Sequence, residues 1–301
     1  MKKIKVLLLF SGGLDSLLVA HVLKKQGVSV TPFCFSSYFF DCKKSLETIK
    51  QTGLRLKVID ISKDHLKMIK SPKYGRGVGM NPCVDCHLLM LKKAKQIMKK
   101  DKYDFLATGE VLGQRPFSQS NQALDLIERK AGLKGLILRP LSDKLLKETK
   151  FGNEGFYRIS GKSRKEQLKL AKEFQIKNIP MPGGGCILTD ANFSFKLKEL
   201  FRRKKNFNGN DVQLLRIGRV FFNDTFFIVV ARNQNECKEL LKQRKRGDIV
   251  LEPNNFSGPT VLIRKIKKSS QDEMINFASE YIIKFSKDVP IEPVIAILPF
   301  L

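Results

Sequence analysis

A glycine-rich segment near the start of the chain has the residue types that bind phosphate. It reads Ser11-Gly12-Gly13-Leu14-Asp15-Ser16. The two glycines allow a tight turn with exposed backbone N–H groups, and the two serines add hydroxyl donors. Asp15 could hold Mg²⁺ or a group of a nucleotide. We therefore predict a phosphate-binding loop, and it is not a Walker loop, because no GxxxxGK[ST] sequence occurs in the chain.

Three cysteines form a second group of reactive residues. Cys83 and Cys86 are separated by two residues, and Cys186 follows three glycines, Gly183 to Gly185. Two cysteines with this spacing at the start of a helix can bind one metal, and the helix dipole favours their thiolates. The glycines let a third thiolate come close. Three thiolates leave one coordination position open, and an open position allows chemistry.

Several interpretations of these cysteines stay open on the residues alone. They are a structural zinc with His87 or Asp85 as fourth ligand, a C-x-x-C-H haem attachment motif, a dithiol or persulfide relay of Cys186 with Cys83 or Cys86, and a three-cysteine [4Fe–4S] cluster.

Composition suggests a polyanionic partner. The chain has 301 residues, enough for two domains, and 42% of them are hydrophobic, which supports a buried core. It carries 56 Lys and Arg against 29 Asp and Glu, a formal net charge of +27. Nucleic acid is the first partner that such a charge indicates. A generally lysine-rich surface is the alternative.

The sequence shows no sign of export or of a membrane partner. No stretch approaches the roughly 20 apolar residues of a spanning helix. We therefore expect a cytoplasmic protein with reduced thiols, whose six cysteines serve metal or redox chemistry rather than disulfides. Cys34 and Cys237 stand in apolar or helical surroundings, where we expect them to pack.

The elements that must position these residues alternate between strand and helix. Strands are predicted at 3–10, 28–35, 54–61, 105–108 and 136–138, and helices at 14–25, 43–52, 88–100 and 163–174. This order predicts an α/β fold with a doubly wound, mainly parallel sheet. Ligands of such sheets bind beyond the carboxyl ends of the strands, where the Ser11 loop and the turn at Thr108 and Gly109 both fall.

The character of the sequence changes near the basic segment 202–210. Beyond it, strands are predicted at 212–215, 219–222, 226–231 and 260–266, and helices at 236–244 and 272–285. We therefore expect two domains, at 1–203 and 204–301. The second is a smaller, basic α+β domain, which we expect to bind RNA.

An ordered set of motifs carries a family resemblance. The phosphate loop is followed by Asn81-Pro82-Cys83-Val84-Asp85-Cys86, by 107–116 (ATGEVLGQRP), by 139–142 (RPLS), by 159–165 (ISGKSRK) and by the glycines before Cys186. The first 200 residues resemble the PP-loop ATP pyrophosphatases that thiolate tRNA, and are similar to the 4-thiouridine synthetases and 2-thiouridylases. Segment 218–264 more weakly resembles the RNA-associated domain of ribosome quality-control proteins.

The resemblance implies an activity and a set of site residues. It implies that ATP adenylates a uracil oxygen of tRNA and that sulfur from sulfide or a donor protein then replaces it, with Mg²⁺ and a [4Fe–4S] cluster as cofactors. The nucleotide-binding residues that it implies are Ser11, Gly12, Gly13, Asp15, Ser16, Thr108 and Gly109. The implied catalytic residues are Asp15, Cys83 and Cys186, and the implied metal ligands are Cys83, Cys86 and Cys186.

Other functions stay open. One is a sulfur transferase that uses a cluster or a persulfide and acts on a small molecule. Another is a non-catalytic RNA-binding protein with a structural zinc. An amide-forming PP-loop synthetase is disfavoured, because nitrogen transfer needs no thiolate site. A second copy of the chain is a candidate partner.

Overall fold

The computed structural model describes residues 3–146, 149–152, 154–181 and 186–300. It divides into two compact units, Met1–Thr189 and Asp190–Leu301. Among the described residues, no helix combines the length and the apolar character needed to cross a membrane.

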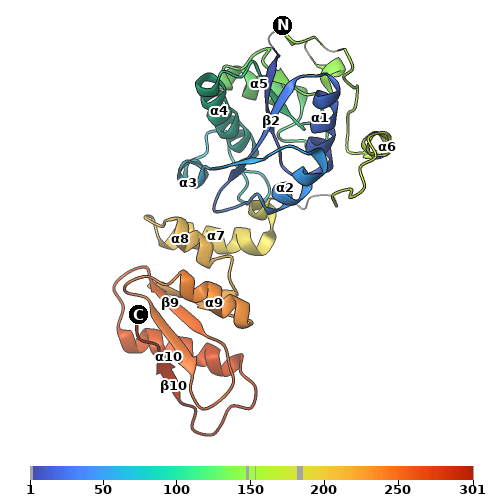
Figure 1. Cartoon of the computed structure of the whole chain (residues 1–301). Coiled ribbons are helices and arrows are strands. Elements are labelled where there is room, and N and C mark those ends of the chain that lie inside the picture. The colour runs from blue at the N-terminus through green and yellow to red at the C-terminus, as the bar shows by residue number, and fades with distance from the viewer. Residues whose placement is uncertain (1–2, 147–148, 153, 182–185, 301) are drawn as a thin grey trace. The chain divides into compact units, whose positions relative to one another are not determined.

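The first unit is built on a five-stranded parallel sheet (Figure 1). Its strands are β1 (Lys5–Leu9), β2 (Ser29–Ser36), β3 (Lys57–Asp60), β4 (Phe105–Thr108) and β5 (Ile137–Leu138), in the order β3-β2-β1-β4-β5. The central position of β1 places the loop that follows it at the middle of the carboxyl edge. The predicted parallel α/β fold is confirmed.

Helices cover this sheet on both faces. They are α1 (Leu14–Lys25), α2 (Lys43–Thr48), α3 (Ser62–Lys70), α4 (Cys83–Asp101), α5 (Asn121–Ala131) and α6 (Lys165–Glu173), with 3₁₀ turns at Ile49–Thr52, Asp143–Leu145 and Ile187–Thr189. The bounds of α1 match the prediction. Helices α3 and α5 were not predicted, and the helix expected at 43–52 becomes 3₁₀ after Thr48.

Alternation along β1 explains the two layers. Val6 and Leu8 pack with α1 in one core cluster, whereas Leu7 packs with α4 and α5 in another. All three are 0% exposed. Successive strand residues point to opposite faces, so an uninterrupted apolar run is what a strand buried on both faces needs.

The second unit has an antiparallel five-stranded sheet in the order β10-β8-β9-β7-β6. Its elements are α7 (Ala191–Arg203), α8 (Gly209–Leu214), β6 (Arg219–Phe222), β7 (Phe226–Val230), α9 (Gln234–Lys242), β8 (Ile249–Pro253), β9 (Val261–Lys265), α10 (Gln271–Lys284) and β10 (Ile295–Ile297). Met274, Ala278 and Ile282 of α10 pack into the core cluster of this sheet. The second, smaller α+β domain is confirmed as a fold class.

Two details of this unit differ from the sequence prediction. The strand expected at 212–215 is wrong, because Asn208 and Asp211 form a capping box that starts α8 there. Strands β8 and β10 were not predicted.

The division between the units lies at Thr189/Asp190 rather than after residue 203. Helix α7 belongs to the second unit, since Lys196 donates to the backbone oxygens of Leu215 and Gly218. Its last residue, Arg203, pairs with Asp224 at 2.9 Å. The basic run that follows α7 in the sequence is therefore not the boundary.

Candidate active site

Gly12 makes the loop after β1 possible. Its φ is +74°, and a Cβ there would lie 2.7 Å from the backbone of Lys44 and of Ser45. A residue with a side chain would therefore be strained and would also collide with α2. The loop is pressed against the start of α2, and α1 begins immediately after Gly13.

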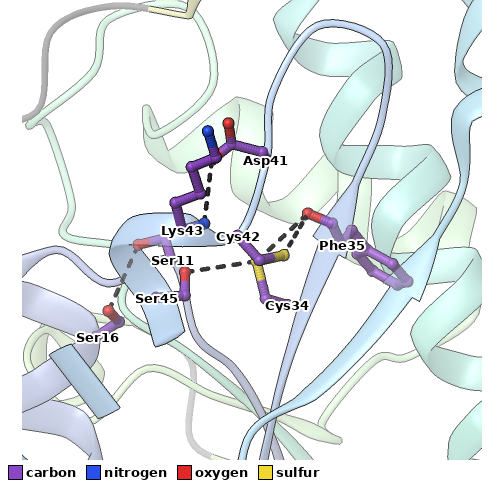
Figure 2. The surroundings of a disulfide bond; sticks show 8 residues. All are labelled: Ser11, Ser16, Cys34, Phe35, Asp41, Cys42, Lys43 and Ser45. Atoms are coloured by element: carbon purple, nitrogen blue, oxygen red, sulfur yellow. Dashed lines mark hydrogen bonds between the residues drawn. A yellow bond between two sulfur atoms is a disulfide. The ribbon is translucent and has the colours of Figure 1, made fainter. Parts of the chain in front are cut away.

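The serines of the loop lie together at the start of α1. Ser16 Oγ donates to the backbone oxygen of Gly13 at 2.9 Å, and the Ser11 and Ser16 hydroxyls are 3.4 Å apart (Figure 2). Gly13 caps α1 without a side-chain bond. The free backbone N–H groups of a helix start, with hydroxyls beside them, form an anion-binding arrangement.

Asp15 lies in the first turn of α1, where two glutamines and two arginines affect the pKa of its carboxyl group. Its Oδ2 accepts a hydrogen bond from Gln114 Nε2 at 3.3 Å. Burial raises the pKa of the Asp15 carboxyl and outweighs the opposing effects of Gln114, Gln167, Arg164 and Arg115. Gln114 lies in the motif segment 107–116, whereas nothing in the sequence pointed to Gln167.

The turn after β4 lies against the same helix start. A Cβ on Gly109 would lie 2.8 Å from the backbone nitrogen of Ser16. Thr108 is buried, and its hydroxyl donates to Glu110 Oε2 at 3.0 Å. Gly109 therefore brings β4 close to the phosphate loop, while the Thr108 side chain is engaged with Glu110.

Glu110 connects this turn to α4, the helix that contains Cys83 and Cys86. Its Oε1 lies 2.9 Å from His87 Nδ1, and its Oε2 accepts from Arg139 Nε at 3.0 Å. Burial favours the protonated acid, but the Arg139 charge and the contacts with His87 hold the pKa of Glu110 at about 2. The Glu110 carboxylate is thus ionised between Arg139 and His87. Because His87 directly follows Cys86, this contact links the turn after β4 to the cysteines.

Cys83 and Cys86 lie in the first turn of α4, and Cys186 lies near enough to affect the charge of Cys86. Burial raises the pKa of the Cys86 thiol, and Cys186, Cys83 and Asp85 raise it further. Cys86 Sγ lies 3.3 Å from His65 Nε2, whose own pKa burial lowers to about 4. The thiolate preference expected from the helix dipole is therefore outweighed at Cys86. The glycines at 183–185, which we predicted to ease the approach of Cys186, lie outside the described residues.

Thiols are the main potential metal donors near the start of α4. Among the described residues, no group of three or more His, Cys, Asp or Glu side chains could hold one metal ion. Asp85 was considered as a zinc ligand, but its two carboxylate oxygens accept hydrogen bonds from the backbone N–H groups of Lys73 and Tyr74, at 3.0 and 2.8 Å. Thiols are the usual ligands of iron–sulfur clusters, and the His65 imidazole lies beside one of them.

Cys34 and Cys42 form a disulfide beside the phosphate loop. This corrects two expectations, that Cys34 only packs and that the six cysteines serve metal or redox chemistry rather than disulfides. Cys34 lies in β2, and Cys42 immediately precedes α2. Ser45 of α2 donates from its hydroxyl to Cys34 Sγ at 3.4 Å (Figure 2). The pairing brings the end of one strand to the start of the next helix, a closeness that sequence separation alone does not reveal.

A small cavity of about 70 Å³ opens next to Cys83. It is lined by the segment from Tyr74 to Gly77, by Asn81, Cys83 and Val84, and by Phe117. Asn81 Nδ2 donates to Cys83 Sγ at 3.2 Å. Phe117 is 61% exposed, so a large apolar side chain faces solvent beside Cys83.

Parts of the chain are similar in sequence to known proteins. Residues 2–148 match the model of the ThiI family, described as thiamine biosynthesis protein (ThiI). A probable tRNA sulfurtransferase of Finegoldia magna is 33% identical over 145 residues, which cover 46% of this chain and 36% of that protein. The tRNA-specific 2-thiouridylase MnmA of Karelsulcia muelleri is 28% identical over 133 residues, 40% of this chain and 34% of that protein. The chain thus spans about a third of the length of these curated relatives.

Among solved structures, the U34-tRNA thiolase NcsA from Methanococcus maripaludis, described with its [4Fe–4S] cluster, is similar to this chain. It has a TM-score of 0.33 and 22% identity, covering 71% of this chain and 70% of that one.

The second unit also matches a known family. Residues 218–295 match the model of the NFACT protein RNA binding domain. The resemblances predicted from the motifs are confirmed for both parts of the chain. Residues 2–148 therefore resemble the ThiI family, and residues 218–295 resemble the NFACT RNA-binding domain.

Proposed function

We propose that this protein uses ATP to replace a uridine oxygen of tRNA with sulfur. One observation carries the proposal, namely a continuous path of contacts from the phosphate loop to the cysteines. Gly109 touches Ser16 of the loop, and the next residue, Glu110, bonds to His87 beside Cys86. A nucleotide on the loop and a sulfur species on the cysteines would therefore meet in one unit.

The phosphate loop serves the first half of the reaction. Uracil oxygen attacks the α-phosphorus of ATP, pyrophosphate leaves, and AMP becomes attached to the base. The N–H groups and hydroxyls between Ser11 and Ser16 stabilise the departing pyrophosphate. Asp15, whose Oδ1 makes no hydrogen bond with a described residue, holds Mg²⁺.

The cysteines serve the second half. Cys83, Cys86 and Cys186 would hold a [4Fe–4S] cluster, which supplies an open iron position for sulfide. Sulfur attacks the ring carbon, and AMP departs with the original oxygen. His65 and Asn81 each place a polar group within 3.3 Å of a cysteine sulfur, so they orient Cys86 and Cys83.

RNA binding is assigned to the basic surface and the second unit. The net charge of +27 suits a phosphate backbone, and the NFACT-type domain belongs to an RNA-binding family. Cytoplasmic location, the sulfide donor and a second copy of the chain stay predictions from the sequence.

Nucleoside mass spectrometry tests this function. Unmodified tRNA is incubated with anaerobically purified protein, ATP, Mg²⁺ and sulfide, and the digest is searched for thiouridine. Cys186→Ala is the test variant, and Cys237→Ala is the matched control, because Cys237 is a free cysteine of the second unit.

We expect thiouridine with the native chain and with Cys237→Ala, and none with Cys186→Ala. Release of AMP and pyrophosphate should depend on the RNA. Absence of thiouridine from the native reaction, with iron bound, would contradict the proposal and favour a small-molecule sulfur acceptor. Bound zinc without AMP release would instead favour the non-catalytic RNA-binding alternative.

A further inference from the structure

A fully buried amide in the first unit has both polar atoms unpaired. Gln167, in the first turn of α6, is 0% exposed, and its Nε2 and Oε1 make no hydrogen bond with any described residue. Burial of an unpaired amide is costly, and most such groups in folded proteins have a partner. The missing partner of Gln167 is therefore expected to be a bound ligand.

Gln167 faces the phosphate loop. Helix α6 packs against α1 in a shared core cluster that includes Leu170 and Ala171, and Phe174 stacks on His21 of α1. Figure 1 shows α1 and α6 on the same side of the first unit. The Gln167 amide lies beside the Asp15 carboxylate and lowers its pKa as a hydrogen-bonding neighbour does, but the two groups are not close and aligned enough to form a regular hydrogen bond.

Asp15 has an unpaired atom of its own. Its Oδ1 is buried and has no hydrogen-bond partner among the described residues, whereas Oδ2 accepts from Gln114. The buried Gln167 and the half-buried Asp15, from different helices, thus offer two oxygen acceptors and one amide N–H donor to the same place. Carboxylate and amide oxygens are ligands that Mg²⁺ accepts, and an amide N–H donates to phosphate oxygens.

The charges around this place suit a phosphate. Arg164, which precedes α6, and Arg115 both lower the Asp15 pKa through their charge, so two guanidinium groups lie nearby. The positive ends of α1 and α6 add to this field, since Asp15 and Gln167 both belong to first turns. An anion that carries its own Mg²⁺ satisfies the cationic groups and the carboxylate together.

We infer that Gln167, with Asp15 Oδ1, receives the Mg²⁺-bound pyrophosphate portion of a nucleoside triphosphate. Helix α6 is then a second wall of the nucleotide site, opposite the phosphate loop. This inference rests on the proposed function for the identity of the ligand. It adds a ligand-contacting residue that no motif of the chain indicated.

The direction in which a Gln167 substitution changes the unfolding temperature distinguishes a ligand-binding role from a structural one. Gln167→Leu keeps the approximate size of the side chain and removes the unpaired amide. If Gln167 serves the ligand, the ligand-free variant unfolds at the same or a higher temperature than the native chain. A residue kept for stability would give a lower unfolding temperature.

Calorimetric titration of the full chain with Mg²⁺–pyrophosphate and with Mg²⁺–ATP tests the inference. We expect Gln167→Leu to weaken both ligands at least tenfold. The nearly isosteric Gln167→Glu should weaken binding of both ligands further, because its carboxylate, next to Asp15, repels phosphate. This variant replaces Gln167→Leu in the test if the leucine variant does not fold. Gln122→Leu, at the exposed start of α5, is the matched control and should bind as the native chain does.

The outcomes distinguish the inference from the proposed function. Native affinity in both Gln167 variants, with binding intact in the native chain, would overturn the inference alone. A native chain that binds neither ligand would overturn both. Weakened binding in the variants supports the inference even where no thiouridine is formed.

Discussion

Glu110 and Arg139 form a buried ion pair that joins the ends of two neighbouring parallel strands, β4 and β5. Arg139 Nε lies 3.0 Å from Glu110 Oε2, and the two side chains are 5% and 8% exposed. Arg139 also pairs with Glu128 of α5 at 2.9 Å. The pair keeps Glu110 ionised, and the Glu110 carboxylate also bonds to His87. It therefore holds the turn after β4 against α4, which carries Cys83 and Cys86.

Replacement of Arg139 should be strongly destabilising. Arg139→Met leaves the Glu110 carboxylate buried without its main counter-charge, and we expect a loss of about 3–5 kcal/mol in the free energy of unfolding. Urea denaturation measures it. The double variant Arg139→Met with Glu110→Gln should recover part of the loss, and equal losses in the single and double variants would contradict the ion-pair account.

The same pair predicts an acid transition. The pKa of Glu110 is about 2 in the folded chain, against an ordinary value near 4.5. A lowered folded pKa gives stability that is present above about pH 4.5 and is lost as pH falls toward 2. The slope from this group reaches at most about 1.4 kcal/mol per pH unit. Unfolding free energies at several pH values should fall less steeply for Glu110→Gln than for the native chain.

Gly12→Ala should abolish nucleotide binding. The added Cβ meets the backbone of Lys44 and Ser45 at 2.7 Å, so the loop must move away from α2. Gly27→Ala is the matched control, because Gly27 has φ +73° but nothing within 4 Å of its Cβ position. Both variants should lose about 1 kcal/mol of stability from positive φ, whereas only Gly12→Ala should lose titratable Mg²⁺–ATP binding.

The disulfide should stabilise the chain without serving the cluster. Loss of the Cys34–Cys42 link through the double alanine variant should cost about 2–3 kcal/mol under non-reducing conditions. Iron content after anaerobic purification should equal that of the native chain. A loss of iron as large as that in Cys86→Ala would show that these two cysteines contribute to the cluster.

Phe117 should contribute to RNA binding. An exposed aromatic ring beside the cavity at Cys83 can stack on an unpaired base, a contact worth roughly 1–3 kcal/mol. Phe117→Ala is expected to weaken tRNA binding in a filter assay about fivefold or more. Val58→Ala, which shortens another exposed apolar side chain of the first unit, should leave the affinity unchanged.

Local chemistry in the sequence determined the five parallel strands of the first unit and the positions of the motifs. The run before Ser11 is apolar without interruption, which only a strand buried on both faces needs, and the parallel sheet followed from the alternation with helices. The spacing of Cys83 and Cys86 and the glycines of the phosphate loop were visible for the same reason, because their effects act over a few neighbouring residues.

Contacts between distant segments were decided by the tertiary structure. The Cys34–Cys42 bond, the placement of Gln167 beside Asp15 and the Glu110–Arg139 pair each join different elements. Helix α8 replaced a predicted strand because a capping box outweighed the apolar alternation at 212–215. Sequence periodicity reports which face of an element is buried, but the partner on that face depends on how the whole chain packs, so these pairings appear only in the folded structure.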